Sequence, residues 1–333
     1  MNATRRVIVP FDLSPAAPAL GAVVHALQGE TMGTSWCVKY SGARGADLLP
    51  LGDAIQSRLD TVVAQMSPWE EDSGISRFNR APAQSWHALP DEFAQVIECA
   101  LQLAEASGGA FDPTAGELVA LWGFGPAGRV STAPPPDALA AARTRAGWHR
   151  LIRRDGLLQQ PGGSTLDLSA IAKGHGVDLV SRLLLERGVE NHLVEVGGEL
   201  RGCGVRPDGQ PWWVDLQAPP AAAGLPGTRV ALHGLSVATS GDYLRCFVDE
   251  RGIRRSHTID PRSGSPIEHA LASVSVLHAE CMHADALSTA LGVLGREEGM
   301  AFARRFDVAA LFVERRGTRF VETLSPALEA MAA

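Results

Sequence analysis

The apolar residues of the chain recur at helical spacing in three segments. Residues 90–107 carry such a pattern, and Gly108 and Gly109 end it. The same spacing follows Lys173 and is closed by Gly188, a residue type that favours the backbone conformation of a helix end. Residues 284–294 repeat the pattern. We therefore expect three helices at these positions.

Short segments rich in β-branched and aromatic residues suggest strands in the second half of the chain. Residues 126–136 and 218–227 are rich in Pro, Gly and Ala, and we expect surface loops there. Helices and hairpins without a strict alternation of strand and helix indicate an α+β fold. The expected strands are residues 193–196, 212–216, 247–259 with a turn at 250–252, 273–277, 308–313 and 319–322.

Composition excludes several classes of protein. A net charge of −7 without a run of basic residues argues against nucleic acid as the main partner, because phosphate backbones are bound by clustered Lys and Arg. No apolar segment is long enough for a transmembrane helix. The N-terminal residues lack the unbroken apolar stretch of a signal peptide, so the sequence as written favours a cytoplasmic location.

Cysteine and lysine usage adds two smaller points. The five cysteines are widely spaced and form no C-x-x-C pair, which argues against a zinc site and against a disulfide framework. Of the 30 cationic residues only Lys39 and Lys173 are lysines, so Lys173 stands out.

The third expected helix carries a polar face. Asp285, Ser288 and Thr289 stand at positions i, i+3 and i+4, which lie on one side of a helix. A carboxylate beside two hydroxyls offers the hard oxygen ligands that Mg²⁺ prefers. The alternative is a structural polar face, with a hydroxyl bonded to the preceding helical turn.

The second expected helix begins near Lys173 and Gly174. A helix N-terminus presents unpaired N–H groups and the positive end of its dipole, so a lysine there is suited to a phosphate or pyrophosphate. A capped helix with a solvated lysine is the equally simple alternative.

A third candidate lies around residues 240–243 and 256–261. Pro261 and the glycine that follows at Gly264 mark a tight turn that would hold His257 and Asp260 in a rigid frame, where acid–base chemistry is possible. A structural role for both side chains is the alternative. No G-x-S-x-G elbow, Walker A loop or G-x-G-x-x-G fingerprint precedes a helix.

Taken in order, the motifs of the chain resemble those of the ApbE family of flavin transferases. The resemblance covers about residues 29–295, most of the chain. The matching blocks are residues 30–34 (ETMGT), 66–69 (MSPW), 73–79 (SGISRFN), 111–114 (FDPT), 121–125 (LWGFG), 167–174 (DLSAIAKG) with Asp178, 195–199 (EVGGE), 240–243 (SGDY), 257–261 (HTIDP) and 284–290 (ADALSTA).

The resemblance implies a fold, a domain and two ligand sites. The fold would be α+β, with T-fold-like mixed sheets and packed helices. Residues 29–325 would form one domain, or two intertwined subdomains, after a flexible extension of residues 1–28. FAD would bind near Met32, Trp69, Ala110, Phe111, Asp112, Asp167, Lys173 and Ile259, and Mg²⁺ would be held by Ala170, through its carbonyl oxygen, with Asp285, Ser288 and Thr289.

The chain departs from the family pattern at three points. Trp69 replaces the usual tyrosine, which keeps an aromatic surface and loses a hydroxyl. Ser288 stands where relatives often have an acidic residue, so the expected metal site is less negative. Family members are often periplasmic or membrane-anchored, whereas this sequence shows no clear export signal.

The implied activity is Mg²⁺-dependent transfer of the FMN half of FAD to a Ser or Thr hydroxyl of a target protein, through a phosphoester bond, with release of AMP. His257 is the first candidate for the general base and Asp242 the second, and Lys173 would hold a phosphate or the leaving group. Two alternatives stay open: an FAD pyrophosphatase, which gives free FMN and AMP, and an FAD-binding protein without turnover.

Overall fold

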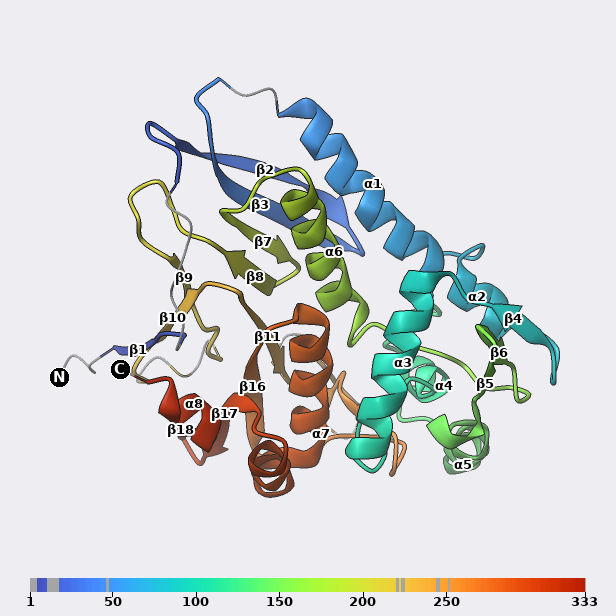
Figure 1. Ribbon diagram of the computed structural model, residues 1–333. Helices are drawn as coiled ribbons and strands as arrows, with labels where there is room; N and C mark the ends of the chain where they lie inside the picture. The colour runs from blue at the N-terminus through green and yellow to red at the C-terminus, as the bar shows by residue number, and fades with distance from the viewer. Residues whose placement is uncertain are drawn as a thin grey trace.

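The structure is a computed structural model that describes residues 5–10, 18–45, 48–219, 222, 225–243, 246–250 and 252–332. Parts of the expected N-terminal extension and of the expected loop at residues 218–227, and one residue of the turn at 250–252, lie outside the described residues. The fold is a mixture of helices and sheets (Figure 1). The predicted α+β class is confirmed by this arrangement.

A sheet of eight antiparallel strands forms the centre of the molecule. Its order is β18-β17-β16-β11-β8-β7-β3-β2. The strands are β2 (Val23–Thr31), β3 (Thr34–Gly42), β7 (His192–Val196), β8 (Glu199–Cys203), β11 (Leu235–Gly241), β16 (Leu271–His278), β17 (Ala309–Arg316) and β18 (Arg319–Leu324).

Two helices cover one face of this sheet. α6 (Ala172–Glu186) packs on β7 and β8, and α7 (Cys281–Arg305) packs on β11 and β16 (Figure 1). Val274 and Val276 of β16 face α7, while Leu277 points to the opposite side, into a cluster with Trp212 and Leu328. β16 is therefore covered on both faces, which explains why nearly all of its residues are buried and apolar or small.

Smaller elements surround the central sheet. β1 (Arg6–Ile8), β10 (Thr228–Leu232) and β9 (Trp212–Asp215) form a second sheet beside α8 (Pro326–Ala330). The remaining elements are α1 (Leu49–Met66), α2 (Gly74–Asn79), β4 (Trp86–Ala88), α3 (Asp91–Ala106), α4 (Gly116–Leu121), α5 (Pro136–Arg145), η1 (Trp148–Arg150), β5 (Ile152–Arg154), β6 (Leu157–Gln159), β12 (Cys246–Val248), β13 (Arg254–Ser256), β14 (Ile259–Asp260) and β15 (Ser265–Pro266).

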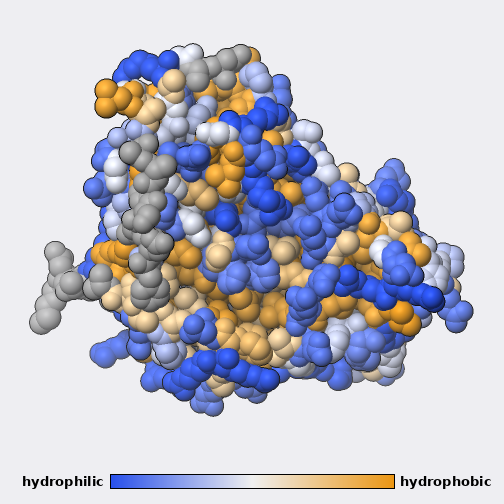
Figure 2. All heavy atoms as spheres, viewed as in Figure 1, coloured by the Kyte–Doolittle hydropathy of each residue, from blue (hydrophilic) through white to orange (hydrophobic). Residues whose placement is uncertain are grey.

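Helix α1 shows how surface and core are divided. Ile55, Leu59, Val62 and Met66 form one buried stripe along it. Asp53, Arg58 and Asp60 are exposed on its outer side, and the face of the molecule seen in Figure 2 mixes hydrophilic and hydrophobic surface. Among the described residues no helix is both long and apolar enough to cross a membrane.

The β2–β3 hairpin turns through two residues with left-handed backbone. Met32 has φ of 50° and Gly33 has φ of 68°, and Thr31 pairs with Thr34 across the turn. Positive φ at both central positions is typical of a type I′ turn, whose twist matches that of paired strands. Methionine rarely adopts this conformation, so we infer that the packing around Met32 keeps its backbone in the left-handed region.

The three predicted helices are confirmed as α3, α6 and α7, and two of their limits differ from expectation. α7 begins at Cys281 and continues to Arg305, past Gly295, whose φ of 73° interrupts the helical backbone. The apolar pattern breaks at this kink, so the sequence predicts only the first part of α7.

The loop expected at residues 126–136 ends where α5 begins, at Pro136. β2 begins at Val23, inside the segment expected to be a flexible extension.

We predict that Gly174→Ala destabilises the fold, because the two helices touch at this glycine. A Cβ atom at Gly174 would lie 2.3 Å from the Cys281 carbonyl oxygen and 2.8 Å from Asp285 Cβ. Overpacking of this kind lowers the free energy of unfolding by about 1–3 kcal/mol, which urea denaturation can measure. Gly292→Ala in α7 is the matched control, since its Cβ would meet nothing within 4 Å. Equal stability of the two variants would contradict the prediction.

Candidate active site

The N-termini of α6 and α7 meet, and each helix supplies a hydrogen-bond acceptor to the other. Asp285 of α7 accepts from the Gly174 N–H at 3.0 Å. Asp178 of α6 accepts from the Cys281 N–H at 3.0 Å and from the Met282 N–H at 2.9 Å. Each helix start has unpaired N–H groups and the positive end of a dipole, so a carboxylate beside it is stabilising. The two aspartates therefore cap the two helices reciprocally.

Asp178 is buried and is also bound by an arginine from the sheet. Arg201 Nη1 lies 3.0 Å from Asp178 Oδ1, and the same nitrogen donates to the Ala279 carbonyl oxygen. Burial raises the pKa of Asp178, although the N–H groups of α7 and the charge of Arg201 act to lower it. Arg201 thus links the start of α7 to β8.

Lys173 extends from the first turn of α6 to Glu199 at the start of β8. Its Nζ contacts Glu199 Oε1, and its aliphatic stem passes over Gly197 in the β7–β8 turn. Burial acts to lower the pKa of Lys173, but Asp285 and Glu199 raise it by more, so the net change is upward. The ammonium is therefore charged at neutral pH.

Two buried carboxyl groups flank this ammonium. Burial and the charge of Asp285 act to raise the pKa of Glu199, while Lys173 acts to lower it. Burial also raises the pKa of Asp285, against the effects of Lys173 and of the Gly174 N–H. Both carboxyls are destabilised as anions because they share a buried space with one positive charge. The cluster would be stabilised by a further cation.

Three hydroxyl groups lie next to Asp285. Ser240 Oγ of β11 is 2.8 Å from Ser288 Oγ and 3.0 Å from Thr289 Oγ1. Ser288 Oγ also donates to the Asp285 carbonyl oxygen at 2.9 Å, which is the bond to the preceding turn that the structural alternative expects. Ser288 is thus engaged within the fold. In the part of the chain that the structure describes, Thr289 Oγ1 bonds only Ser240.

The oxygen donors of this cluster fit a small, hard cation. Asp285 offers a carboxylate and Thr289 a hydroxyl, and Mg²⁺ commonly takes one or two protein carboxylates and fills its shell with phosphate and water. Ala170 lies just before α6, and the Gly174 N–H in the first turn of this helix donates to Asp285, as the first N–H groups of a helix have no partner within it. No group of three or more His, Cys, Asp or Glu among the described residues is arranged to hold a metal, so carbonyl and hydroxyl oxygens would be needed.

Met32 lies against the first turns of α6. A Cβ atom placed on Gly176 would be 3.1 Å from Met32 Cε. The β2–β3 turn also brings Thr34 to Gly197, where an added Cβ would be 2.8 Å from Thr34 Cγ2. The structure therefore brings one predicted flavin contact, Met32, within a helical turn of another, Lys173.

The loops that carry Asp112 and Asp167 lie side by side. The Asp167 N–H donates to the Pro113 carbonyl oxygen at 2.8 Å. Asp112 accepts from the Thr114 N–H and hydroxyl through Oδ1, and from the Trp148 N–H at 3.0 Å through Oδ2. Burial raises the pKa of Asp112, and these hydrogen bonds act to lower it. Asp112 therefore fixes its own loop, which includes the buried residues Ala110 and Phe111.

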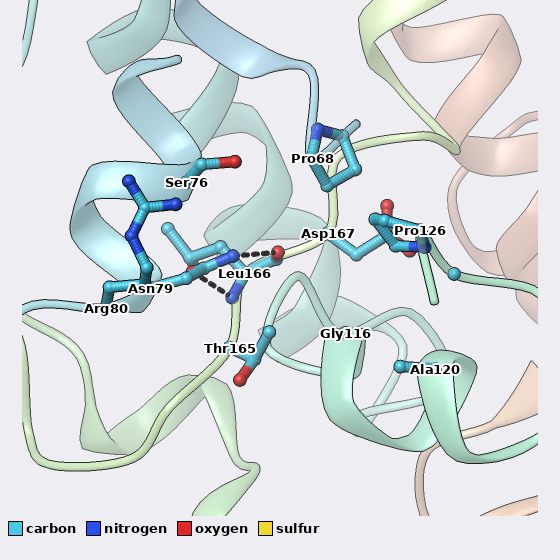
Figure 3. Close-up of a pocket in the computed structure, with 11 residues that line it drawn as sticks. Pro68, Ser76, Asn79, Arg80, Gly116, Ala120, Pro126, Thr165, Leu166 and Asp167 are labelled. Carbon is cyan, nitrogen blue, oxygen red and sulfur yellow. Dashed lines mark hydrogen bonds between the residues drawn. The ribbon is translucent and has the colours of Figure 1, made fainter. Parts of the chain in front are cut away.

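A small cavity of about 190 Å³ opens beside Asp167 (Figure 3). Asn79 at the end of α2 holds this segment through its side-chain amide, which donates to the Leu166 carbonyl oxygen at 3.0 Å and accepts from the Leu166 N–H at 2.8 Å. Pro68 also lines the cavity and precedes Trp69, whose side chain is exposed. A second cavity, of about 500 Å³, is lined by Asp112 together with Trp148, His149, Arg143 and Arg262.

The two candidate bases have different surroundings. His257 packs edge-on against Phe124, with ring centres 6.2 Å apart, and Phe124 borders the apolar cluster that contains Ile259. Both oxygens of Asp242 are bound by Arg315 at 2.6 Å, and Arg254 adds a further bond at 2.8 Å. Asp242 is thus clamped between two guanidinium groups.

Four residues that organise the site have no role predicted from the sequence. They are Asn79, Asp178, Glu199 and Ser240, which belong to the motifs of the family. One signal was present for Asp178, a carboxylate within a stretch that is otherwise apolar. The partners of Glu199 and Ser240 come from distant segments, so no local pattern identifies them.

A buried carboxylate with neighbouring hydroxyls, a paired lysine and two converging helix N-termini are typical of sites that bind a phosphate-bearing ligand together with a cation. Comparison with known families is more specific. The model described as "ApbE family" matches residues 32–312, and the chain belongs to this family.

Individual relatives are similar to this chain over nearly the whole length of both proteins. The chain is 39% identical to the FAD:protein FMN transferase of Vibrio cholerae, over 91% of this chain and 90% of that protein. It is 35% identical to the protein of the same name from Haemophilus influenzae, over 97% and 96%. The apo crystal structure of the Pseudomonas stutzeri flavinyl transferase ApbE matches with a TM-score of 0.87 and 40% identity, over 94% of this chain and 98% of that one. The expected family and its fold are therefore confirmed.

We predict that Asp178→Asn loosens the start of α7. The amide keeps one acceptor oxygen, but its NH₂ group would face a backbone N–H, and Arg201 would lose its charged partner. Leaving buried donors unpaired costs about 1–3 kcal/mol in the free energy of unfolding. Hydrogen exchange at the Cys281 and Met282 amides should be faster than in Asp53→Asn, a control at an exposed carboxylate of α1. Unchanged exchange would show that Asp178 does not cap the helix.

Proposed function

We propose that the chain is an FAD:protein FMN transferase, which moves the FMN half of FAD to a Ser or Thr hydroxyl of a target protein through a phosphoester bond and releases AMP. The observation that supports this most is the cluster of Lys173, Asp285 and Thr289 where two helix N-termini meet. Relatives that match over nine-tenths of their length carry this name.

In this proposal Mg²⁺ is held by Asp285 and Thr289 with the Ala170 carbonyl oxygen. The cation would offset negative charge on the phosphoryl oxygens of FAD. Ser288 supports the site indirectly, since it orients Ser240 and the helix backbone beside Thr289. Because these hydrogen bonds engage the Ser288 hydroxyl, we propose that Ser288 binds the cation more weakly than Thr289 does.

Lys173 is proposed to bind the pyrophosphate of FAD or the departing AMP. Its ammonium is charged at neutral pH, and it stands on the first turn of α6, where the helix dipole also favours an anion. Met32, Trp69, Ala110, Phe111, Asp112, Asp167 and Ile259 are proposed to surround the rest of FAD.

His257 is proposed as the general base. The target hydroxyl oxygen would bond to the phosphorus of the FMN half, the bond from that phosphorus to the AMP oxygen would break, and the hydroxyl proton would pass to a ring nitrogen of His257. Asp242 suits this role less well, because hydrogen bonds from Arg254 and Arg315 occupy its oxygens.

Two other activities use the same site. With water in place of the target hydroxyl the products would be free FMN and AMP, as in an FAD pyrophosphatase. An FAD-binding role without turnover is favoured by one observation, the engagement of Ser288 within the fold. Flavin attached covalently to the target, free FMN, and intact FAD distinguish the three.

We predict that Asp285→Asn lowers FMN transfer by roughly a hundredfold or more, because the cation loses its carboxylate ligand. The readout is flavin fluorescence on the denatured target protein after incubation with FAD and Mg²⁺. Asp137→Asn, at an exposed position of α5, is the control and should transfer normally. Two outcomes would contradict the proposed metal site. One is transfer by Asp285→Asn at the rate of the control, and the other is transfer by the unaltered protein after removal of divalent cations.

We predict that His257→Gln lowers the rate of transfer by about 10²–10⁴-fold while FAD binding is retained, as expected for loss of a general base. Stopped-flow transfer assays and FAD titration measure the two quantities separately. A variant with weakened FAD binding and normal turnover would assign His257 to binding instead.

A further inference from the structure

Glu199 holds the Lys173 ammonium at a defined place between two carboxylates. Lys173 Nζ contacts Glu199 Oε1, and the charge of Asp285 also acts on Lys173. The Glu199 and Asp285 residues are both about 4% exposed. A buried ammonium is stabilised by pairing with one carboxylate or the other, so the position of Nζ decides which carboxylate is left for another cation.

The position of Glu199 is fixed by the sheet. Glu199 is the first residue of β8, which is paired with β7 on one side and β11 on the other. It follows the tight turn Gly197-Gly198, where φ is 61° and 103°. A side chain mounted on an interior strand next to a tight turn has little freedom to follow a moving partner. Glu199 is therefore suited to anchor the flexible Lys173 side chain.

Asp285 has one partner at the start of α6, which is a neutral N–H group. Its Oδ2 accepts from the Gly174 N–H at the start of α6. If Lys173 were not bound to Glu199, its ammonium would be drawn to Asp285, because this carboxylate is bound to the N–H of the next residue, Gly174. An ammonium paired with Asp285 would compete with a divalent cation for the same oxygens.

We propose that Glu199 is a positioning residue that keeps the Lys173 ammonium off Asp285 and so leaves the Asp285 carboxylate free to bind a divalent cation. This inference rests on the proposed metal site and goes further, because it assigns separate carboxylates to the lysine and to the cation. Glu199 Oε2 is buried and has no hydrogen-bond partner among the described residues. The rival explanation is therefore that Glu199 is itself a ligand of the cation.

The test uses Mn²⁺ as the probe and measures its binding to the full chain by the loss of the free-ion EPR signal. Glu199→Gln should weaken Mn²⁺ binding on the order of tenfold, the usual effect of losing a residue that orients a metal ligand. The double variant Glu199→Gln with Lys173→Met should recover most of this loss, because the competing ammonium is gone. If Glu199→Gln fails to fold, Glu199→Asp, which moves the carboxylate one methylene away from Nζ, should show a loss in the same direction and the same recovery.

The outcomes separate the explanations. Unchanged Mn²⁺ binding in Glu199→Gln overturns the proposal. Weak binding that persists in the double variant also overturns it and assigns Glu199 as a metal ligand. Asp285→Asn is the reference: if the unaltered protein binds Mn²⁺ no better than Asp285→Asn, the metal site of the proposed function fails as well, whereas binding that depends on Asp285 confines a failure to the role of Glu199.

Discussion

The site depends on one electrostatic constraint, the meeting of two helix N-termini inside the protein. Two positive dipole ends with unpaired N–H groups repel each other and are costly to bury. Asp178 and Asp285 remove this cost, because each helix carries the acceptor that the other helix needs. Gly174 permits the close approach, since any side chain there would strike the backbone of α7.

The same constraint explains the charge pattern around the site. The sheet compensates Asp178 through Arg201 of β8, whereas Lys173 at the start of α6 is paired with Glu199 of β8. Asp285 is the carboxylate with the least compensation, because among the described residues its side chain is hydrogen-bonded to a neutral N–H group and burial raises its pKa. A cation bound beside Asp285 would supply the compensation that this carboxylate lacks.

The sequence predicts local features of this fold well and distant pairings poorly. The helical spacing of apolar residues identified α3, α6 and the first part of α7, and the spacing of Asp285 and Thr289 indicated their shared face. The continuation of α7 was missed because Gly295 breaks the pattern. The clamp on Asp242 joins it to Arg315, 73 residues away, and Lys173 meets Glu199 only when α6 packs on β8. Such pairs depend on how distant segments of the chain pack together, and a local sequence pattern does not predict that packing.

The most direct test of this account is a crystal structure of the protein with FAD and Mn²⁺, in which anomalous scattering locates the metal. The account predicts the metal at Asp285 and Thr289, with the pyrophosphate beside Lys173 where α6 and α7 meet. A metal bound elsewhere, or a pyrophosphate away from the two helix N-termini, would contradict it.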